Sequence, residues 1–281
     1  MCETLPDLSI ITKERRSTNL NRSEELATEA LKVAESGRQT GILVRVLGAC
    51  AIRIHSPGSK ALLDHMQRLI SDVDFVSHSK YESEIHALFT SLGYLPDSQI
   101  SKLYAHMYGQ IRDRFKDPKT STTLDVFYDK LEMCHTIDLR KRLEVDFPTI
   151  SVSDLLLEKM QIVKINKKDI EDTLVLLREH AVSESEQDSL NSKYIARVLS
   201  DDWGFYYTVA TNLRNLKEYV TSYVILADSA EVIQGRIDAV LKAIDAHPKS
   251  LGWKMRAKIG PGRKWYNEVE EVSMGPSVGG K

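Results

Sequence analysis

The chain has 281 residues, of which 42% are hydrophobic and 28% are charged, and its formal net charge at pH 7 is -2. This composition supports a buried core and excludes wholesale disorder, and the length fits one large domain or two modest ones. The nearly neutral charge excludes a uniformly basic nucleic-acid-binding protein, so any such contact must come from a local patch.

The cysteines and the N-terminus indicate the cellular setting. Cys2, Cys50 and Cys134 lie far apart without a CxxC pair, which excludes a disulfide framework and a cysteine zinc site. The N-terminus has no apolar signal-like segment, and no apolar run approaches membrane-spanning length. We therefore expect a soluble cytoplasmic protein with no membrane partner.

The N-terminal part of the chain predicts strands mixed with helices. Residues 1–21 are polar and predict an arm, and residues 24–36 predict a helix with Ser23 as its N-cap and Gly37 near its end. The β-branched run from Ile42 predicts a strand that ends in glycine. The further predicted elements are short helices over 49–55 and 61–69, a loop at 56–60, a strand over 71–77, a helix over 81–93, strands over 103–115 and 122–128, and extended segments within 135–151.

From Ser151 onward the pattern is almost purely helical. Apolar residues recur with helical spacing in every long segment, and this change marks a domain boundary. The sequence thus predicts an α+β protein, in which a domain with a small mixed sheet (residues 22–150) precedes an all-helical domain (residues 151–281). The predicted helices lie within residues 151–165, 167–181, 189–200, 202–220 and 230–246.

Two acids lie two residues apart in the predicted strand at 71–77. Side chains alternate along a strand, so Asp72 and Asp74 project from one face and Val73 from the other. Adjacent like charges favour a cation between them, and Mg²⁺ prefers oxygen ligands. Asp125 supplies a third acid between apolar residues on a second predicted strand. If the strands are neighbours, three acids can align a triphosphate and activate an attacking hydroxyl.

A DxD pair on a strand also has a plain structural interpretation, namely a polar strand end that faces solvent. The upstream context favours a functional site, because a strand and a helix meet at Gly48 and Ala49. Gly48 allows the backbone to approach a phosphate, and the N-terminus of the following helix offers unpaired N–H groups.

With these features, residues 42–177 resemble the nucleotidyltransferase superfamily of the DNA polymerase β type. The matching features are the strand ending in Gly48-Ala49, the helix, Asp72-x-Asp74 on a strand and a lone Asp125 on a later strand. The segment from Arg68 to Phe75 resembles abortive-infection-type nucleotidyltransferase toxins. Two departures are an alanine where the family usually has a second glycine or a serine, and a long separation between Gly48 and Asp72.

The resemblance implies a set of roles. Asp72, Asp74 and Asp125 would hold Mg²⁺ or Mn²⁺, and Asp125 would also activate the acceptor hydroxyl. A nucleoside triphosphate would be the substrate. Its contacts would come from Gly48, Ala49, Arg68, Ser71 and Lys159.

Lys159 stands out without reference to any family. At about 100° per residue, Leu155, Leu156, Ile162 and Val163 define one apolar face of a predicted helix, and Lys159 falls in its middle. Its ammonium must reach water along the surface or find an anion. The resemblance favours the triphosphate as that anion. In the Lys168–Asp172 segment, which also resembles the family, the acids are interpreted as complementing a helix dipole.

Two further basic segments have open interpretations. Arg112, Arg114 and Lys116 share one face of a predicted strand, as in a solvated edge strand or a phosphate contact. Near the C-terminus, residues 253–266 interleave basic and aromatic side chains, which can bind RNA. Acids follow this second segment directly, so self-packing or a homodimer contact is the favoured interpretation.

The preferred hypothesis is an enzyme that transfers a nucleoside monophosphate from an NTP to a hydroxyl or phosphate of an acceptor. RNA, a protein side chain and a small molecule all remain open as the acceptor. The alternatives are a non-catalytic nucleotide-binding or regulatory module on the same fold and a metal-dependent hydrolase.

Overall fold

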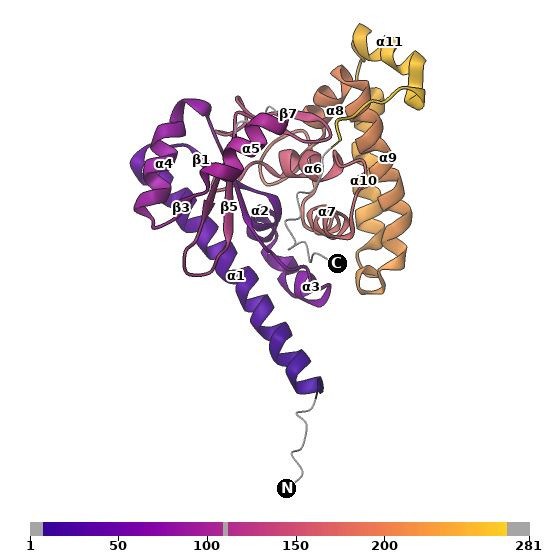
Figure 1. Ribbon diagram of the computed structural model, residues 1–281. Coiled ribbons are helices and arrows are strands. Elements are labelled where there is room, and N and C mark those ends of the chain that lie inside the picture. The colour runs from indigo at the N-terminus through magenta and orange to yellow at the C-terminus, as the bar shows by residue number, and fades with distance from the viewer. Residues whose placement is uncertain (1–7, 109–111, 269–281) are drawn as a thin grey trace, which may run out of the picture.

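The computed structural model describes residues 8–108 and 112–268 of the protein. Within these ranges five strands form one mixed sheet, and most of the later chain is helical (Figure 1). The predicted arrangement of a small mixed sheet followed by helices is therefore confirmed. The strands are β1 (Val44–Leu47), β2 (Val73–Ser77), β3 (Leu95–Pro96), β4 (Arg112–Lys116), β5 (Thr123–Tyr128), β6 (Lys130–Glu132), β7 (Thr136–Asp138), β8 (Val182–Ser183) and β9 (Leu190–Asn191).

The helices fall close to the predicted segments in the C-terminal half and less closely in the N-terminal half. The helices are α1 (Leu8–Thr40), α2 (Gly48–His55), α3 (Lys60–His65), α4 (Glu82–Ser91), α5 (Ser98–Tyr108), α6 (Val152–Met160), α7 (Lys167–Glu179), α8 (Ser192–Asp201), α9 (Trp203–Tyr219), α10 (Ala230–Ala246) and α11 (Leu251–Ile259). Short 3₁₀ turns lie at Pro57–Ser59, Ser79–Tyr81, Val220–Ser222, Val224–Leu226 and Gly260–Gly262.

The sheet has the order β1-β2-β5-β4-β3, in which only β2 and β5 are parallel neighbours. Asp74 on β2 is in register with Asp125 on β5, and Asp125 is in register with Arg114 on β4. Residues in register on neighbouring strands project from the same face of a sheet. Two acids and an arginine are thereby placed side by side in the middle of the sheet.

Helix α1 is longer than predicted at both ends. The predicted N-cap, Ser23, lies inside the helix, and its buried hydroxyl accepts a hydrogen bond from the backbone N–H of Ile70 at 3.1 Å. The cap interpretation was wrong because this hydroxyl serves a distant backbone group. Residues 8–21 of the predicted arm belong to α1, and residues 1–7 lie outside the described residues.

The segment predicted as one strand over residues 103–115 is a helix followed by a strand. The carboxylate of Asp97 accepts a hydrogen bond from the N–H of Ile100 at 3.3 Å and so caps α5. Ile100, Leu103 and Met107 follow helical rather than alternating spacing. Helix α5 ends at Tyr108, and β4 supplies the strand.

Of the helices after β7, all except α10 begin at polar caps that the sequence shows plainly. The side chains of Ser151, Asn166, Asn191, Asp202 and Ser250 each accept a hydrogen bond from a backbone N–H three residues later. Such caps satisfy donors that a helix leaves unpaired and fix where it starts. They explain why the C-terminal half matches the prediction closely.

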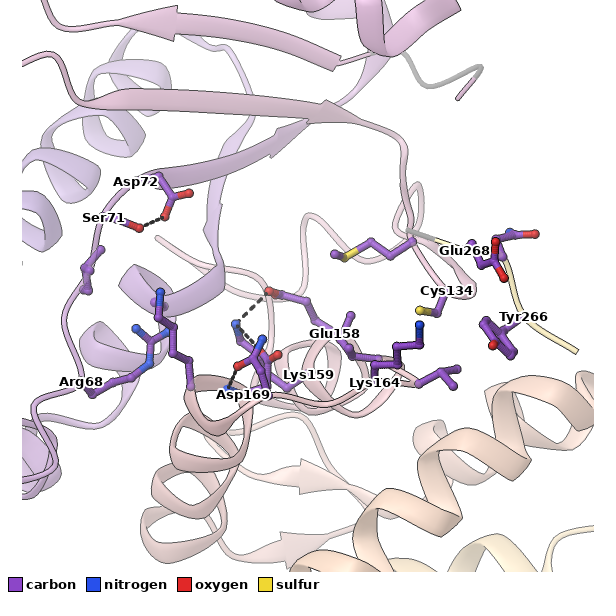
Figure 2. Close-up of a pocket in the computed structure, with 18 residues that line it drawn as sticks. Arg68, Ser71, Asp72, Cys134, Glu158, Lys159, Lys164, Asp169, Tyr266 and Glu268 are labelled. Atoms are coloured by element: carbon purple, nitrogen blue, oxygen red, sulfur yellow. Dashed lines mark hydrogen bonds and ion pairs between the residues drawn. The ribbon is translucent and has the colours of Figure 1, made fainter. Parts of the chain in front are cut away.

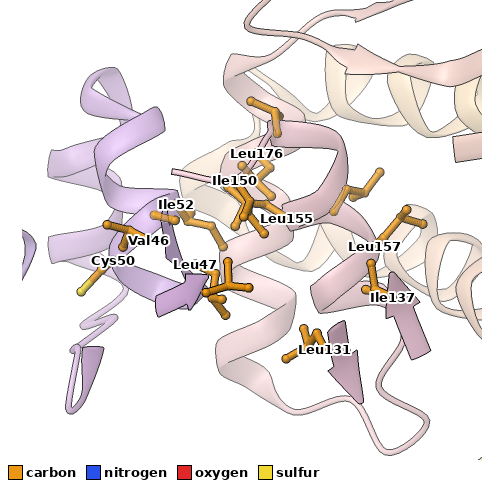
Figure 3. Packing of buried hydrophobic residues seen from close by; sticks show 14 of the residues in the cluster. Val46, Leu47, Cys50, Ile52, Leu131, Ile137, Ile150, Leu155, Leu157 and Leu176 are labelled. Carbon is orange, nitrogen blue, oxygen red and sulfur yellow. The ribbon is translucent and has the colours of Figure 1, made fainter. Parts of the chain in front are cut away.

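A single cluster of buried apolar residues joins the sheet to the later helices (Figure 3). It includes Val46 on β1, Ile52 on α2, Leu155 on α6 and Leu176 on α7, all fully buried. The sheet and the helices are therefore held together by one continuous core rather than by a polar seam. In the described part of the chain, no helix has the length and apolar character needed to cross a membrane.

Candidate active site

The site begins where β1 passes into α2 at Gly48. Gly48 has a φ of +70°, and a Cβ atom added to it would lie 2.8 Å from Oδ2 of Asp74. Both facts require glycine, because the left-handed region and so close an approach disfavour any side chain. The N–H of Gly48, predicted to contact a phosphate, donates a hydrogen bond to Oε2 of Glu158 at 3.1 Å.

Asp74 is the electrostatic centre of the site. Its side chain is partly buried, and burial together with the negative charges of Asp72 and Asp125 raises its pKa well above the usual range. Within the described residues, no side chain or backbone group makes a hydrogen bond or ion pair with its carboxylate. Asp72 is exposed and directly precedes β2, and it accepts a hydrogen bond from the hydroxyl of Ser71 at 3.1 Å. Neither carboxyl group of this pair therefore has an ion-pair partner among the described residues.

Asp125, the third predicted metal ligand, is differently placed. It is fully buried, and its two oxygens accept hydrogen bonds from Arg114 at 2.8 and 2.9 Å and a further one from Arg112. The side chains of Arg112 and Arg114 are only 15% and 20% exposed and bond to Asp125, so they do not form a solvated edge face. In the part of the chain that the structure describes, no group of three metal-ligating side chains could hold an ion. In this structure the oxygens of Asp125 are thus occupied by arginines, whereas Asp72 and Asp74 have no ion-pair partner among the described residues.

Lys159 and Arg68, both predicted to contact the nucleotide, belong to a buried ion-pair cluster. Arg68 makes a two-pronged contact with Asp172 at 2.8 and 2.7 Å, and the ammonium of Lys159 lies 3.2 Å from Asp172 and 3.4 Å from Asp169. Although burial alone would lower it, the pKa of Lys159 is raised by Asp172, Glu158 and Asp169. The ammonium of Lys159 is therefore paired with carboxylates of the protein itself.

The helix that carries Lys159 also differs from the prediction. Helix α6 ends at Met160, so Ile162 and Val163 lie beyond it in the connection to α7. All nine residues of α6 are buried, including Glu158 and Lys159. The helix therefore has no solvent face from which a lysine side chain could extend into water.

Glu158 is a site residue that the sequence interpretation missed. Its side chain is buried, burial raises its pKa, and its Oε1 lies 3.7 Å from the ammonium of Lys159. Its other oxygen holds the N–H of Gly48. The sequence signal was weak, because a glutamate beside a lysine on a helix normally indicates an exposed face.

A cavity of about 490 Å³ opens beside these residues, between the Asp72 end of β2 and the helices α6 and α7. Figure 2 shows Arg68, Ser71 and Asp72 on one side of the cavity and Cys134, Tyr266 and Glu268 on the opposite side. Five of the eight predicted site residues line it, whereas Gly48, Asp74 and Asp125 are not among its lining residues. The five are Ala49, Arg68, Ser71, Asp72 and Lys159.

Two other lysines on the cavity wall were not singled out as phosphate ligands from the sequence. Lys164 and Lys168 lie in and just after the α6–α7 connection and are exposed. In the described ranges neither ammonium has an ion-pair or hydrogen-bond partner, in contrast to Lys159. They are therefore the cations of this wall that remain available to an anion. Lys168 was recognised only as part of a family-like segment.

The C-terminal basic and aromatic segment is self-packed, as favoured from the sequence. The indole N–H of Trp265 donates a hydrogen bond to the hydroxyl of Thr208 at 3.0 Å, and its ring lies 5.1 Å from that of Tyr207. The N–H of Asn267 donates to the carbonyl of Cys134 at 3.0 Å. The acids at 270 and 271 lie outside the described residues. The segment closes one side of the cavity.

No protein-family model matches the sequence, and no curated protein matches it significantly. Among solved structures, the chain is similar to the crystal structure of an antigenic nucleotidyltransferase-like protein from Paracoccidioides brasiliensis. The match covers 75% of this chain and 94% of that one, with 15% sequence identity and a TM-score of 0.36. The chemistry of the site is therefore inferred from its own residues.

Proposed function

We propose that the protein is a nucleotidyltransferase that moves a nucleoside monophosphate from an NTP to a hydroxyl or phosphate of an acceptor. The observation that carries this function is the carboxylate of Asp74. It is held against Gly48 among like charges, it has no hydrogen-bond or ion-pair partner in the described chain, and Asp72, two residues before it, lines a cavity of about 490 Å³. An acid in this state is a site for a cation.

Asp72 and Asp74 fit a divalent ion, Mg²⁺ or Mn²⁺, because these two interacting carboxyl groups have no ion-pair partner among the described residues. Mg²⁺ in nucleotide enzymes is commonly bound by one or two carboxylates together with substrate phosphates. Two acids are therefore sufficient, and Asp125 is not needed as a ligand. When bound, the ion offsets the negative charge that develops on the transferring phosphate.

The chain's own cations position the triphosphate. Lys164 and Lys168 reach the cavity without a competing acid, so they are the phosphate contacts we propose in place of Lys159 and Arg68. Those two residues act indirectly, because they hold Asp169 and Asp172 and so fix the start of α7 beside the cavity. The amide of Gly48 can meet a phosphate only if Glu158 moves away from it.

A non-catalytic nucleotide-binding module is the second candidate function. The observation that favours it is the pair of arginines on Asp125, the residue that would activate the acceptor hydroxyl. Both oxygens that would receive the proton of the acceptor hydroxyl are occupied by guanidinium hydrogen bonds. Catalysis by Asp125 would require Arg112 or Arg114 to transfer its contact to the substrate.

Nucleotide binding is tested by calorimetric titration of the protein with each of the four NTPs, with Mg²⁺ and then with EDTA. We expect binding only with Mg²⁺ and its loss in Asp72→Asn. The matched control is Asp228→Asn, since Asp228 is also exposed and also accepts a serine hydrogen bond at 3.1 Å, from Ser229. Equal affinity with and without Mg²⁺ would contradict the proposed site.

Catalysis is tested with α-labelled NTPs, a cell extract as the source of acceptors, and separate assays for pyrophosphate and phosphate. Label transferred to an acceptor with release of pyrophosphate identifies the transferase. Binding without turnover identifies the non-catalytic module. Release of nucleotide products without labelled acceptor identifies the hydrolase, the third interpretation of the same acids.

A further inference from the structure

The cavity beside Asp72 has an aromatic ring at its opposite end. Tyr266 lies there, and the charged side chains of Lys164 and Glu268 lie at the same end (Figure 2). The lining also includes the apolar side chains of Met133, Ile162 and Val163. A lining that combines an aromatic ring and apolar groups with cations fits a ligand with a flat apolar part and an anionic part.

Tyr266 is held in place on both sides along the backbone. On one side, Trp265 is anchored to α9, and its carbonyl oxygen comes so close to Gly204 that a Cβ atom there would lie 2.6 Å away. On the other side, the N–H of Asn267 is bonded to the carbonyl of Cys134. A ring presented from a fixed backbone loses little further freedom when a ligand stacks on it.

Polar groups beside the Tyr266 ring are available for hydrogen bonds with a ligand. The Tyr266 ring lies 5.3 Å from the ring of Trp265, edge to face, and the ammonium of Lys264 lies 5.5 Å from its centroid. Across the described residues, the phenol hydroxyl of Tyr266 and the side-chain amide of Asn267 have no hydrogen-bond partner. The amide offers a donor and an acceptor side by side at the edge of the cavity.

We infer that this end of the cavity is the nucleobase site, with Tyr266 as the stacking surface and Asn267 as the group that reads the base edge. The inference rests on the proposed nucleotide function and adds a base preference to it. An asparagine amide pairs with the adjacent donor and acceptor of adenine, N6 and N7, whereas guanine presents two acceptors there. The preferred substrate is therefore ATP.

The test compares Kd values for Mg–ATP, Mg–GTP and Mg–triphosphate in the full-length protein and its variants. Loss of base stacking in Tyr266→Leu weakens Mg–ATP binding by roughly ten- to a hundredfold and leaves inorganic triphosphate unchanged. Tyr266→Phe retains the affinity. The matched control is Tyr219→Leu on the exposed surface of α9, which leaves all three ligands unchanged.

Asn267→Asp keeps the size of the side chain and removes its donors, so it abolishes the preference for ATP over GTP. Thermal melting of each variant confirms that it folds. Two results would overturn the nucleobase site alone. In one, Tyr266→Leu binds triphosphate and loses no ATP affinity. In the other, the wild type shows no base preference. Failure of the wild type to bind triphosphate with Mg²⁺ overturns the proposed function and this inference with it.

Discussion

The ammonium of Lys159 lies 3.2 Å from the carboxylate of Asp172, which also accepts two hydrogen bonds from Arg68. This contact joins α6, α7 and the segment before β2 inside the protein. It gives Lys159 a structural partner where the sequence predicted an unpaired ammonium directed at substrate. Opposite consequences for stability follow from these two situations.

Lys159→Met is expected to destabilise the protein by about 3 kcal/mol, the lower end for breaking a buried ion pair by removing one partner. An unpaired ammonium would instead give unchanged or increased stability. Urea unfolding measures the difference. The control is Lys193→Met, because Lys193 pairs with Glu184 at 2.7 Å and both side chains are exposed, so its loss stays within about 0.5 kcal/mol. Reduced NTP affinity at unchanged stability would restore the predicted phosphate contact.

Gly48→Ala and Gly41→Ala separate backbone strain from crowding at the site. Both glycines have a positive φ, of +70° and +75°, but only the Cβ at Gly48 would meet a neighbour within 4 Å, namely Asp74. Each variant should lose about 1–2 kcal/mol of stability through the left-handed conformation. Only Gly48→Ala should displace Asp74 and reduce Mg²⁺-dependent nucleotide binding. Calorimetry and urea unfolding of both variants check this, and equal binding by the two would refute the close approach.

Local patterns predicted the elements that position the site. The apolar run ending in Gly48, the alternation around Asp72 and Asp74, and the polar caps of the later helices each depend on a few neighbouring residues. The register of Asp74 with Asp125 fulfils the expectation that their strands are neighbours. Where local signals compete, as in α5, strand and helix were confused.

The partners of the charged side chains could not be predicted, since they depend on which elements meet in space. Nothing near Asp125 in the sequence shows that Arg112 and Arg114 will bond to it across a strand pair. Glu158 reaches Gly48 over a separation of 110 residues. Charged residues that pair with one another in this way are occupied, so fewer of the candidate residues remain available to bind a substrate.

His135 should make stability depend on pH below neutrality. Burial lowers its pKa to about 4, and its ring stacks on Phe205 at 5.1 Å. The unfolded chain, with a histidine pKa of about 6.5, binds the proton first as the pH falls. Proton uptake by the unfolded chain therefore lowers the free energy of unfolding as the pH falls below about 6.5. The loss reaches about 3 kcal/mol in total towards pH 4. Unfolding measured from pH 8 to pH 4 should show a flatter profile for His135→Gln, whereas exposed His65→Gln should follow the wild type.

Asp74→Asn and Asp125→Asn should change stability in opposite directions, although the two acids face each other in register. Asp74 has no partner in the described chain and stands among like charges, so its removal relieves repulsion and raises the melting temperature without metal. Asp125 is fully buried and accepts hydrogen bonds from two arginines, so its removal takes away the carboxylate of a largely buried ion pair, at about 3–5 kcal/mol.

Mg²⁺ gives the second half of the same test. At ten times its Kd, an ion that binds only the folded protein adds about 1.4 kcal/mol. The wild type and Asp125→Asn should gain this stabilisation when MgCl₂ is added with nucleotide, relative to EDTA, while Asp74→Asn should not. The assignment of Asp125 as a residue held by arginine rather than by metal depends on this contrast. If Asp125→Asn also loses the response to Mg²⁺, Asp125 is a metal ligand after all, and one or both arginines must leave it when the ion binds.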